Sequence, residues 1–184
     1  MILSISGDPG SGKSTVAKRL AAELGLDYFY IGGIRREMAA KRGITLEEYN
    51  KLGETDPSTD LEADEYAKDL GRTHANFIID GRLGWYFVPQ SLKIYLAVDP
   101  RSGAERVWKQ LQRSNERNEG LGLETVENVM RAHSERKASD NFRYRKYYGV
   151  DAFNGANFDF VLDTTNMDKE GVFTKVLERV HTHY

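Results

Sequence analysis

The nine residues GDPGSGKST, residues 7–15, match the pattern G-x-x-x-x-G-K-[ST] at every fixed position. Glycines let the backbone curl so that successive N–H groups point into one concave nest, a shape that favours phosphate. The apolar run ILSIS at residues 2–6 precedes this stretch, and an amphipathic helical pattern from about Lys13 to Leu24 follows it. The order of strand, glycine-rich loop and helix therefore predicts a site for the phosphates of a nucleoside triphosphate.

Each residue type in this loop has a chemical task. Lys13 can reach the β- and γ-phosphates as a point charge, and Ser14 can give its hydroxyl to Mg²⁺. The positive end of the following helix would face the same point. The residues expected around the phosphates are Gly7, Asp8, Pro9, Gly10, Ser11, Gly12, Lys13, Ser14 and Thr15.

Five short apolar runs recur along the chain, with helical patterns between them. Strands that are nearly all apolar and alternate with helices indicate a parallel sheet covered on both faces. We therefore expect one α/β domain of three layers. The runs are ILSIS at 2–6, YFYI at 28–31, FIID at 77–80, KIYLAV at 93–98 and FDFVLD at 158–163.

Capping signals mark several helix ends. Gly25 is expected to end the first helix. TLEE at 45–48 and TDLE at 59–62 read as capping boxes that open two further helices, the second of which would end at Gly71.

Two helical, polar stretches are too long to be simple crossovers between strands. Because ligands of open α/β sheets lie beyond the carboxyl ends of the strands, excursions from those ends are candidates for flaps that close over a substrate. The predicted division is a core of 1–31, 73–100 and 151–184, an acceptor-binding insertion at 32–72 and a lid at 101–150.

The bulk composition excludes several classes of protein. The 184 residues carry 26 Lys and Arg against 28 Asp and Glu, a balance that argues against a nucleic-acid or membrane-surface partner. The absence of cysteine excludes disulfides and thiolate metal sites. The first apolar run is too short for a signal or a membrane span, so a cytoplasmic protein is expected.

The glycine loop does not by itself select a reaction. The chain lacks the N-K-x-D tetrad that reads guanine, and it is short for a motor ATPase, which leaves a small-molecule kinase. FIID ends in Asp80, the pattern of a carboxylate that holds Mg²⁺, and Gly81 and Arg82 follow it. Asp-Gly is also a common turn pair.

Two more clusters carry arginines. Arg35 and Arg36 follow the second predicted strand and could hold an anionic acceptor, or could form a solvated basic face. Arg136, Asp140 and Arg143 share one helix face. Two guanidinium groups on a mobile helix suit a phosphoryl group in transfer, although a salt-bridged surface helix would have the same spacing.

The set GDPGSGKST, GGIRRE, TLEEYNK, DGRLGW, LKIYLAVDP and RYRKYYGVD resembles the short, archaeal-type cytidylate kinases of the nucleoside monophosphate kinase group, over nearly the whole chain. The resemblance implies a P-loop kinase fold with a five-stranded parallel sheet in the order 2-3-1-4-5, an acceptor-binding flap and a lid. It also implies transfer of a phosphoryl group from ATP, with Mg²⁺, to CMP or dCMP. The implied catalytic residues are Lys13, Asp80, Arg136 and Arg143, with Ser14 and Asp80 toward the metal, and the implied acceptor residues are Gly33, Arg35, Arg36, Arg82 and Asp140.

Two positions depart from this family pattern. Relatives usually have Asp where this chain has Gly33, and often Arg where it has Gly103, whereas Arg106 is retained. The first departure bears on the identity of the acceptor base, and the second on the grip on the donor adenine.

Other functions stay open at this point. The same fold could phosphorylate AMP, a sugar or a shikimate-like acid, because the same arginines would bind any anion. A nucleotide-binding regulator without transfer is a third reading, although such a protein would have no reason to keep the whole set of charged residues. A monomer is expected from size and family.

Overall fold

The computed structural model of the protein describes residues 1–113 and 122–184, so residues 114–121 of the expected lid lie outside the described residues. Within those ranges, no helix combines the length and the hydropathy that crossing a bilayer requires. The elements are β1 (Ile2–Gly7), α1 (Lys13–Leu24), β2 (Asp27–Tyr30), α2 (Ile31–Lys41), α3 (Leu46–Leu52), α4 (Ser58–Thr73), β3 (Phe77–Asp80), α5 (Gly84–Phe87), β4 (Leu92–Ala97), α6 (Pro100–Leu111), α7 (Val126–Tyr148), a 3₁₀ turn (Gly155–Asn157), β5 (Phe160–Asp163) and α8 (Lys169–His183).

The five strands form one parallel sheet in the order β2-β3-β1-β4-β5, which confirms the order implied by the family resemblance. β1 is central, and its Ile5 lies opposite Asp80 of β3 and Ile94 of β4. The glycine loop therefore leaves the middle of the sheet next to the residue that ends β3. This register places the loop and Asp80 at one edge of the sheet.

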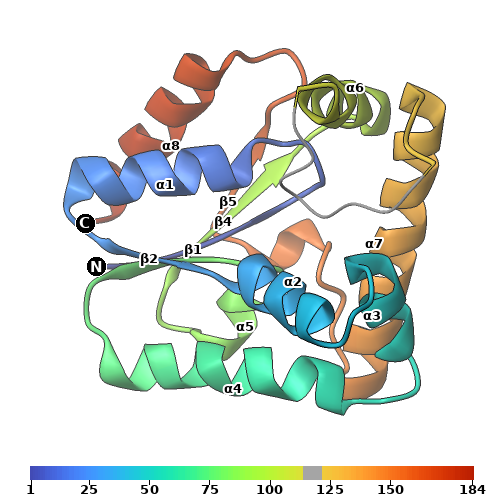
Figure 1. Cartoon of the computed structure of the whole chain (residues 1–184). Helices are drawn as coiled ribbons and strands as arrows, with labels where there is room; N and C mark the ends of the chain where they lie inside the picture. The colour runs from blue at the N-terminus through green and yellow to red at the C-terminus, as the bar shows by residue number, and fades with distance from the viewer. Residues whose placement is uncertain (114–121) are drawn as a thin grey trace.

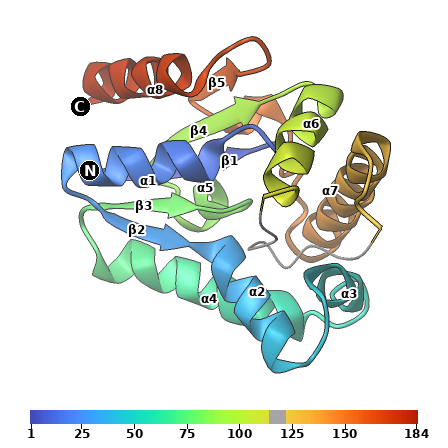
Figure 2. The ribbon, with the colours of Figure 1, turned by 45° about the horizontal axis from the view of Figure 1, so that its top comes forward.

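Helices cover both faces of the sheet, as Figures 1 and 2 show, with α1 and α8 on one face and α4 and α5 on the other. Full burial of each large aliphatic side chain contributes about 1.5–3 kcal/mol. The first face buries Leu3, Ile5, Ile78, Ile94 and Leu96 against Val16, Leu20, Phe173 and Val176. The second buries Phe77 and Ile79 against Ala67, Leu70 and Val88.

The remaining long helices gather beyond the carboxyl ends of the strands. In Figures 1 and 2, α2, α3, α6 and α7 lie on the side toward which the strand arrows point. Residues 32–72 supply most of α2 together with α3 and α4, and residues 101–150 supply α6 and α7. Both excursions thus reach the edge of the sheet at which the glycine loop lies.

Most of the capping predictions are confirmed. Gly25 ends α1 in the left-handed region, with φ +65°, and Thr45 and Glu48 form the predicted capping box. The prediction that a helix begins with a capping box at residues 59–62 is wrong, because α4 begins one residue earlier, at Ser58. The Ser58 N–H donates a hydrogen bond to the Asp56 carboxylate. Gly71 does not end α4, which continues to Thr73.

The glycine loop packs backbone to backbone against the start of α6. A Cβ on Gly103 would lie 2.6 Å from the Pro9 carbonyl oxygen, and one on Gly10 would lie 2.2 Å from the Gly103 carbonyl oxygen. Gly10 also has φ +80°, which side chains rarely adopt. The arginine that the family resemblance leads us to expect at position 103 therefore does not fit this arrangement.

We predict that Gly103→Ala lowers the free energy of unfolding by about 1–3 kcal/mol, because its Cβ forces α6 away from the loop. Urea denaturation followed by circular dichroism measures the change. Gly155→Ala is the matched control, since its Cβ would meet its nearest neighbour at an ordinary 3.8 Å. Equal stability of both variants would contradict the close packing of α6 on the loop.

Candidate active site

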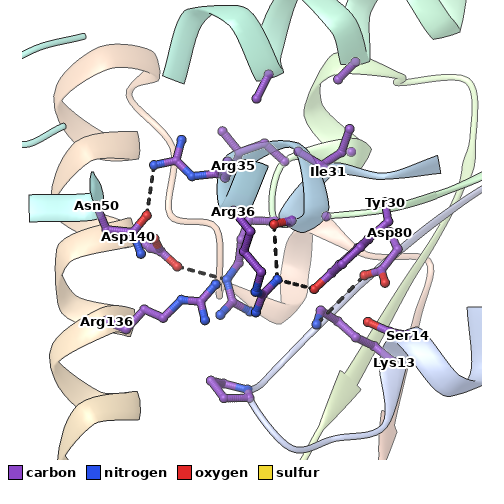
Figure 3. Close-up of a pocket in the computed structure, with 18 of the residues that line it drawn as sticks. Lys13, Ser14, Tyr30, Ile31, Arg35, Arg36, Asn50, Asp80, Arg136 and Asp140 are labelled. Atoms are coloured by element: carbon purple, nitrogen blue, oxygen red, sulfur yellow. Dashed lines mark hydrogen bonds and ion pairs between the residues drawn. The ribbon is translucent and has the colours of Figure 1, made fainter. Parts of the chain in front are cut away.

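A cavity opens at the carboxyl edge of the sheet, between the glycine loop, α2, α4 and α7 (Figure 3). It brings together most of the site residues predicted from sequence, although they come from distant parts of the chain. Those that line it are Asp8, Pro9, Gly10, Gly12, Lys13, Ser14, Thr15, Arg35, Arg36, Asp80, Arg82, Arg136 and Asp140.

Four predicted residues do not line this cavity. The Gly7 carbonyl accepts a hydrogen bond from the Arg82 guanidinium, and Ser11 borders a neighbouring cavity. Gly33 lies on α2 against the ring of Tyr30. Arg143 is completely buried beneath the cavity wall.

Lys13 and Asp80 meet at the edge of the sheet. The Asp80 side chain is fully buried, and its Oδ2 accepts a hydrogen bond from the Tyr28 hydroxyl at 2.9 Å. Its Oδ1 lies 3.9 Å from Lys13 Nζ and has no hydrogen-bond partner among the described residues. Burial and the Asp80 charge together raise the pKa of Tyr28, so this phenol stays a donor to the carboxylate at neutral pH.

This arrangement fits a magnesium ion. A buried carboxylate oxygen without a donor is suited to a cation or to its bound water, and Ser14 adds a hydroxyl to the same cavity. No cluster of three or more acidic, His or Cys side chains that could form a protein-only metal site occurs among the described residues. Mg²⁺ at phosphate sites takes one or two protein ligands and completes its shell with phosphates and water, so Ser14 and Asp80 suffice.

Arg36 is held by the end of the second strand. It donates to the Tyr30 hydroxyl and, at 3.1 Å, to the Gly32 carbonyl, as Figure 3 shows. A Cβ on Gly33 would approach Tyr30 Cδ1 to 2.9 Å, so an aspartate there would require the tyrosine ring to move. In this chain a phenol at position 30 takes the space and orients the arginine.

A chain of five alternating buried charges joins α2 and α4 to α7 and, through Arg82, to the glycine loop. Arg35 on α2 donates to Asp60 on α4, which also accepts two bonds of 2.8 Å from Arg143 Nη1 on α7. Arg143 Nη2 donates to Asp140, and Asp140 Oδ2 accepts from Arg82 Nε at 3.0 Å. All five side chains are largely buried, so each charge depends on the next for its compensation.

Interactions among these five buried charges set the protonation states of Asp140 and Arg143. Burial alone would raise the pKa of Asp140, but Arg82 and Arg143 lower it to about 2, so the carboxylate is ionised at neutral pH. Burial alone would lower the pKa of Arg143, but Asp140 and Asp60 raise it above the ordinary value. Asp140 and Arg143 therefore stay charged at every physiological pH.

The structure places Arg143 outside the cavity lining. Its guanidinium donates hydrogen bonds to Asp60 and Asp140. Arg136, two helical turns earlier on α7, does line the cavity, and Figure 3 shows it pointing toward Arg36. Asp140 lines the cavity as predicted, but its two oxygens are bonded to arginines.

Asp8 ties the glycine loop to its neighbours. Its carboxylate accepts hydrogen bonds from the Tyr95 hydroxyl at 2.8 Å, from the Val98 N–H at 3.3 Å and from Lys137 Nζ at 2.8 Å. Lys137 lies on α7, so this ion pair connects the loop directly to that helix. Asp8 therefore links the glycine loop both to the end of β4 and to α7.

A second cavity adjoins the other side of the glycine loop, between α6 and the segment before α8. Arg106 lines it and donates to the Thr164 carbonyl at 2.7 Å and to the Thr165 carbonyl at 3.0 Å. Gly103 is not among its lining residues, since it faces Pro9. The glycine at position 103 therefore affects how closely α6 packs on the glycine loop, and it does not line this cavity.

Sequence reasoning missed several residues of the site. Tyr28 and Tyr30 read as strand core, and Asp60 read as part of a helix start. Asn50, which accepts from Arg35 Nη2 at 3.0 Å, carried no signal, because a lone polar residue in a helix matches no motif. The one hint in the sequence was a pair of aspartates, Asp60 and Asp64, which lie four residues apart near the start of a predicted helix.

The fold and the site together define a P-loop kinase: a parallel sheet, a glycine loop with lysine and serine at the edge of β1, and arginines that converge on it from elsewhere. The model of the Cytidylate kinase-like family matches residues 2–166. The chain belongs to this family.

Curated relatives agree over nearly the whole chain. The cytidylate kinase of Methanocella arvoryzae is 37% identical over 183 residues, which cover 98% of this chain and 97% of that protein. That of Archaeoglobus fulgidus is 34% identical, covering 98% and 94%. That of Pyrococcus furiosus is 36% identical, covering 96% and 86%.

Solved structures share the fold at low sequence identity. An uncharacterized protein from Eubacterium ventriosum matches with a TM-score of 0.69 at 16% identity, covering 98% of each chain. Shikimate kinase from Bacteroides thetaiotaomicron matches with a TM-score of 0.62 at 13% identity, also covering 98% of each chain. These similarities show the fold alone.

We predict that Asp60→Asn lowers the free energy of unfolding by about 3–5 kcal/mol, because it leaves Arg35 and Arg143 buried without their shared carboxylate. Chemical denaturation measures the loss. Glu170→Gln is the control: it removes a carboxylate from an exposed pair with Arg19 and should leave the midpoint unchanged. A midpoint as high in Asp60→Asn as in the wild type would contradict the buried chain.

Proposed function

We propose that the protein transfers the γ-phosphoryl group of ATP to CMP or dCMP, giving ADP and CDP or dCDP. The observation that carries this proposal is the convergence of cationic side chains from separate segments on one cavity. Those side chains are Lys13 of the glycine loop, Arg36 of α2, Arg82 after β3 and Arg136 of α7. The names of the curated relatives supply the nucleotide.

The donor and acceptor phosphates occupy adjoining parts of the cavity in this scheme. The glycine loop, with Lys13 and Ser14, holds the triphosphate, and its hydrogen-bond donors and helix end match phosphate charge. Arg36 and Arg82 hold the acceptor phosphate, because paired guanidinium groups match phosphate oxygens in geometry. Mg²⁺, held by Ser14 and Asp80 with the phosphates, would neutralise charge on the β- and γ-oxygens.

The chemistry then needs little from the protein beyond position and charge. An oxygen of the acceptor phosphate attacks the γ-phosphorus in line, and the bond to the β-phosphate oxygen breaks. The attacking oxygen is already anionic, so no general base is required. Lys13 and Arg136 spread the charge that develops on the γ-phosphoryl group, and exclusion of water prevents hydrolysis of ATP.

The two excursions have distinct tasks in this proposal. Residues 32–72 form the acceptor-binding insertion and residues 101–150 form the lid, on one core domain. The buried pair of Asp60 and Arg143 joins them, so the acceptor side and the lid are positioned together. Arg35, Asp140 and Arg143 act through this pairing, and Gly33 acts by making room for Tyr30.

The cavity lined by Arg106 is the proposed place of the donor base. It adjoins the glycine loop on the side away from the acceptor arginines, and it has both apolar and polar walls. Arg106 is held by backbone carbonyls, so its guanidinium plane is fixed for stacking on a base.

The competing functions receive less support. The relatives' names favour CMP over AMP, a sugar or a shikimate-like acid, and the likeness to shikimate kinases concerns the fold alone. A regulator without transfer would not need the full set of Lys13, Asp80 and Arg136 in one cavity. A cytoplasmic location, a monomeric state and the absence of nucleic-acid and membrane partners are further parts of this proposal.

Lys13→Ala is expected to lower kcat for CMP phosphorylation by at least about 10³-fold, because it removes the positive charge nearest the transferred group. Coupled ADP release measures the rate. Lys175→Ala, on the exposed face of α8, removes a lysine of the same kind far from the cavity and should retain full activity. Undiminished turnover by Lys13→Ala would overturn the scheme.

The acceptor is tested by the same assay over CMP, dCMP, UMP, AMP, GMP and shikimate. We expect CMP or dCMP to have the highest kcat/KM. A rate with AMP at least about tenfold above that with CMP would replace the cytidylate assignment and keep the fold. Absence of transfer to every acceptor would favour the regulator.

A further inference from the structure

One wall of the cavity is a face of α4 that no sequence motif marked. Asp60, Ala63, Asp64 and Ala67 recur at helical spacing and all line the cavity, opposite the glycine loop. The two alanines are buried and leave space between the helix and α2, and Leu83 and Phe87 border the same region. In Figure 3, Lys13 and Ser14 lie at one end of the cavity, and Arg35 and Arg36 of α2 lie between them and α4.

The two carboxylates on this face have different surroundings. Asp60 is neutralised by Arg35 and Arg143, so its oxygens are occupied. Asp64, one turn later, is 7% exposed and accepts a hydrogen bond from the Tyr148 hydroxyl. Among the described residues it forms no ion pair, although it lines a cavity rich in arginine.

The Asp64 carboxylate is buried with one hydrogen-bond donor, the Tyr148 hydroxyl, and without an ion-pair partner among the described residues, so a further donor from a ligand would stabilise it. Burial raises the pKa of Asp64 to about 6, against the lowering effect of the Tyr148 hydrogen bond. Such a perturbed carboxyl in a cavity wall is typical of a group that contacts a ligand. In the proposed function the phosphate-binding groups occupy the other end of the cavity, so the part of the acceptor that would face this wall is its base.

We propose that Asp64 selects the acceptor base, accepting a hydrogen bond from the 4-amino group of cytosine. This inference rests on the proposed function and names the residue that reads the base. Cytosine presents an amino donor at this position, whereas uracil presents a carbonyl oxygen. Two acceptors facing each other in a buried site repel, so UMP is disfavoured.

The location of Asp64 explains how the chain manages without an aspartate at position 33. The base-reading carboxylate comes from α4, and α2 contributes the phosphate-binding Arg36 and the fixed Arg35. Tyr148 on α7 keeps the Asp64 carboxylate oriented, because its hydroxyl donates a hydrogen bond to Asp64 Oδ2. Burial and Asp64 raise the pKa of Tyr148, so it stays protonated.

Asp64→Asn tests the proposal by steady-state kinetics with CMP and UMP. An amide can turn either its oxygen or its NH₂ toward the base, so the ratio of kcat/KM for CMP to that for UMP should fall about 10- to 100-fold. The ratio should fall through both a lower CMP value and a higher UMP value. Asp69→Asn, an exposed acid on the same helix, is the matched control and should keep the wild-type ratio.

The pH dependence of the wild type provides a second readout that needs no variant to fold. The charged or titratable groups that act on the Asp64 carboxyl are Tyr148 of α7, Asp60 and Lys68 of α4, and Arg35 of α2; the Tyr86 ring of α5 lies against Tyr148. A protonated Asp64 can donate to the uracil oxygen, so the CMP-to-UMP ratio should decline from about pH 8 to about pH 5.5. Titration of the acceptor phosphates affects both substrates alike and cancels in the ratio.

Tyr148→Phe sharpens this readout. It removes a hydrogen bond that lowers the pKa of Asp64, so the decline in the ratio should move to higher pH. A ratio that stays constant with pH in the wild type, or that is unchanged in Asp64→Asn, would overturn the proposal. A wild type that phosphorylates none of CMP, dCMP and UMP would instead overturn the proposed function, which separates the two failures.

Discussion

The carboxylate of Asp60, shared by Arg35 and Arg143, is the interaction on which the geometry of this site depends. It joins α4 of one excursion to α7 of the other, at a depth where no solvent can replace either partner. Charges buried in this way are stable only when each has its partner, so the arrangement tolerates few alternative positions of the two helices. Through Asp140 the same chain reaches Arg82, and Arg82 reaches the Gly7 carbonyl of the glycine loop. The glycine loop, Arg35, Arg82 and α7 are therefore held in one electrostatic unit.

A second constraint acts at the other side of the glycine loop. The loop carries Asp8, whose carboxylate is held by Tyr95 of β4 and by Lys137 of α7, and it lies backbone to backbone on α6 at Gly103. Two helices thus touch the loop directly, α7 through an ion pair and α6 through close packing. A shift of either helix would therefore displace the glycine loop. Such coupling suits an enzyme whose site must exclude water.

The fold could be predicted from the sequence with few errors. The glycine loop, the five apolar runs and the alternating helices were enough for the sheet, because apolar period and capping are local properties of the chain. The errors concern helix ends: Thr59 and Gly71 lie inside α4, where tertiary packing against α5 and β3 extends the helix beyond its local signals. Most of the site residues predicted from sequence line the cavity, because motifs at strand ends converge on one edge of a parallel sheet.

By itself, the sequence determined the phosphate loop, the strand that ends in Asp80 and the arginines that follow strands, since these depend on residues adjacent in the chain. The tertiary structure alone decided how those arginines are used. Arg136 and Arg143 lie on the same helix, yet Arg143 is buried against Asp60 of another helix, whereas Arg136 lines the cavity. It also decided that Tyr30 takes the space beside Gly33 and that Asp64 lines the cavity without an ion pair among the described residues. The physical reason is that burial and charge pairing are set by groups far apart in sequence, which no local pattern records.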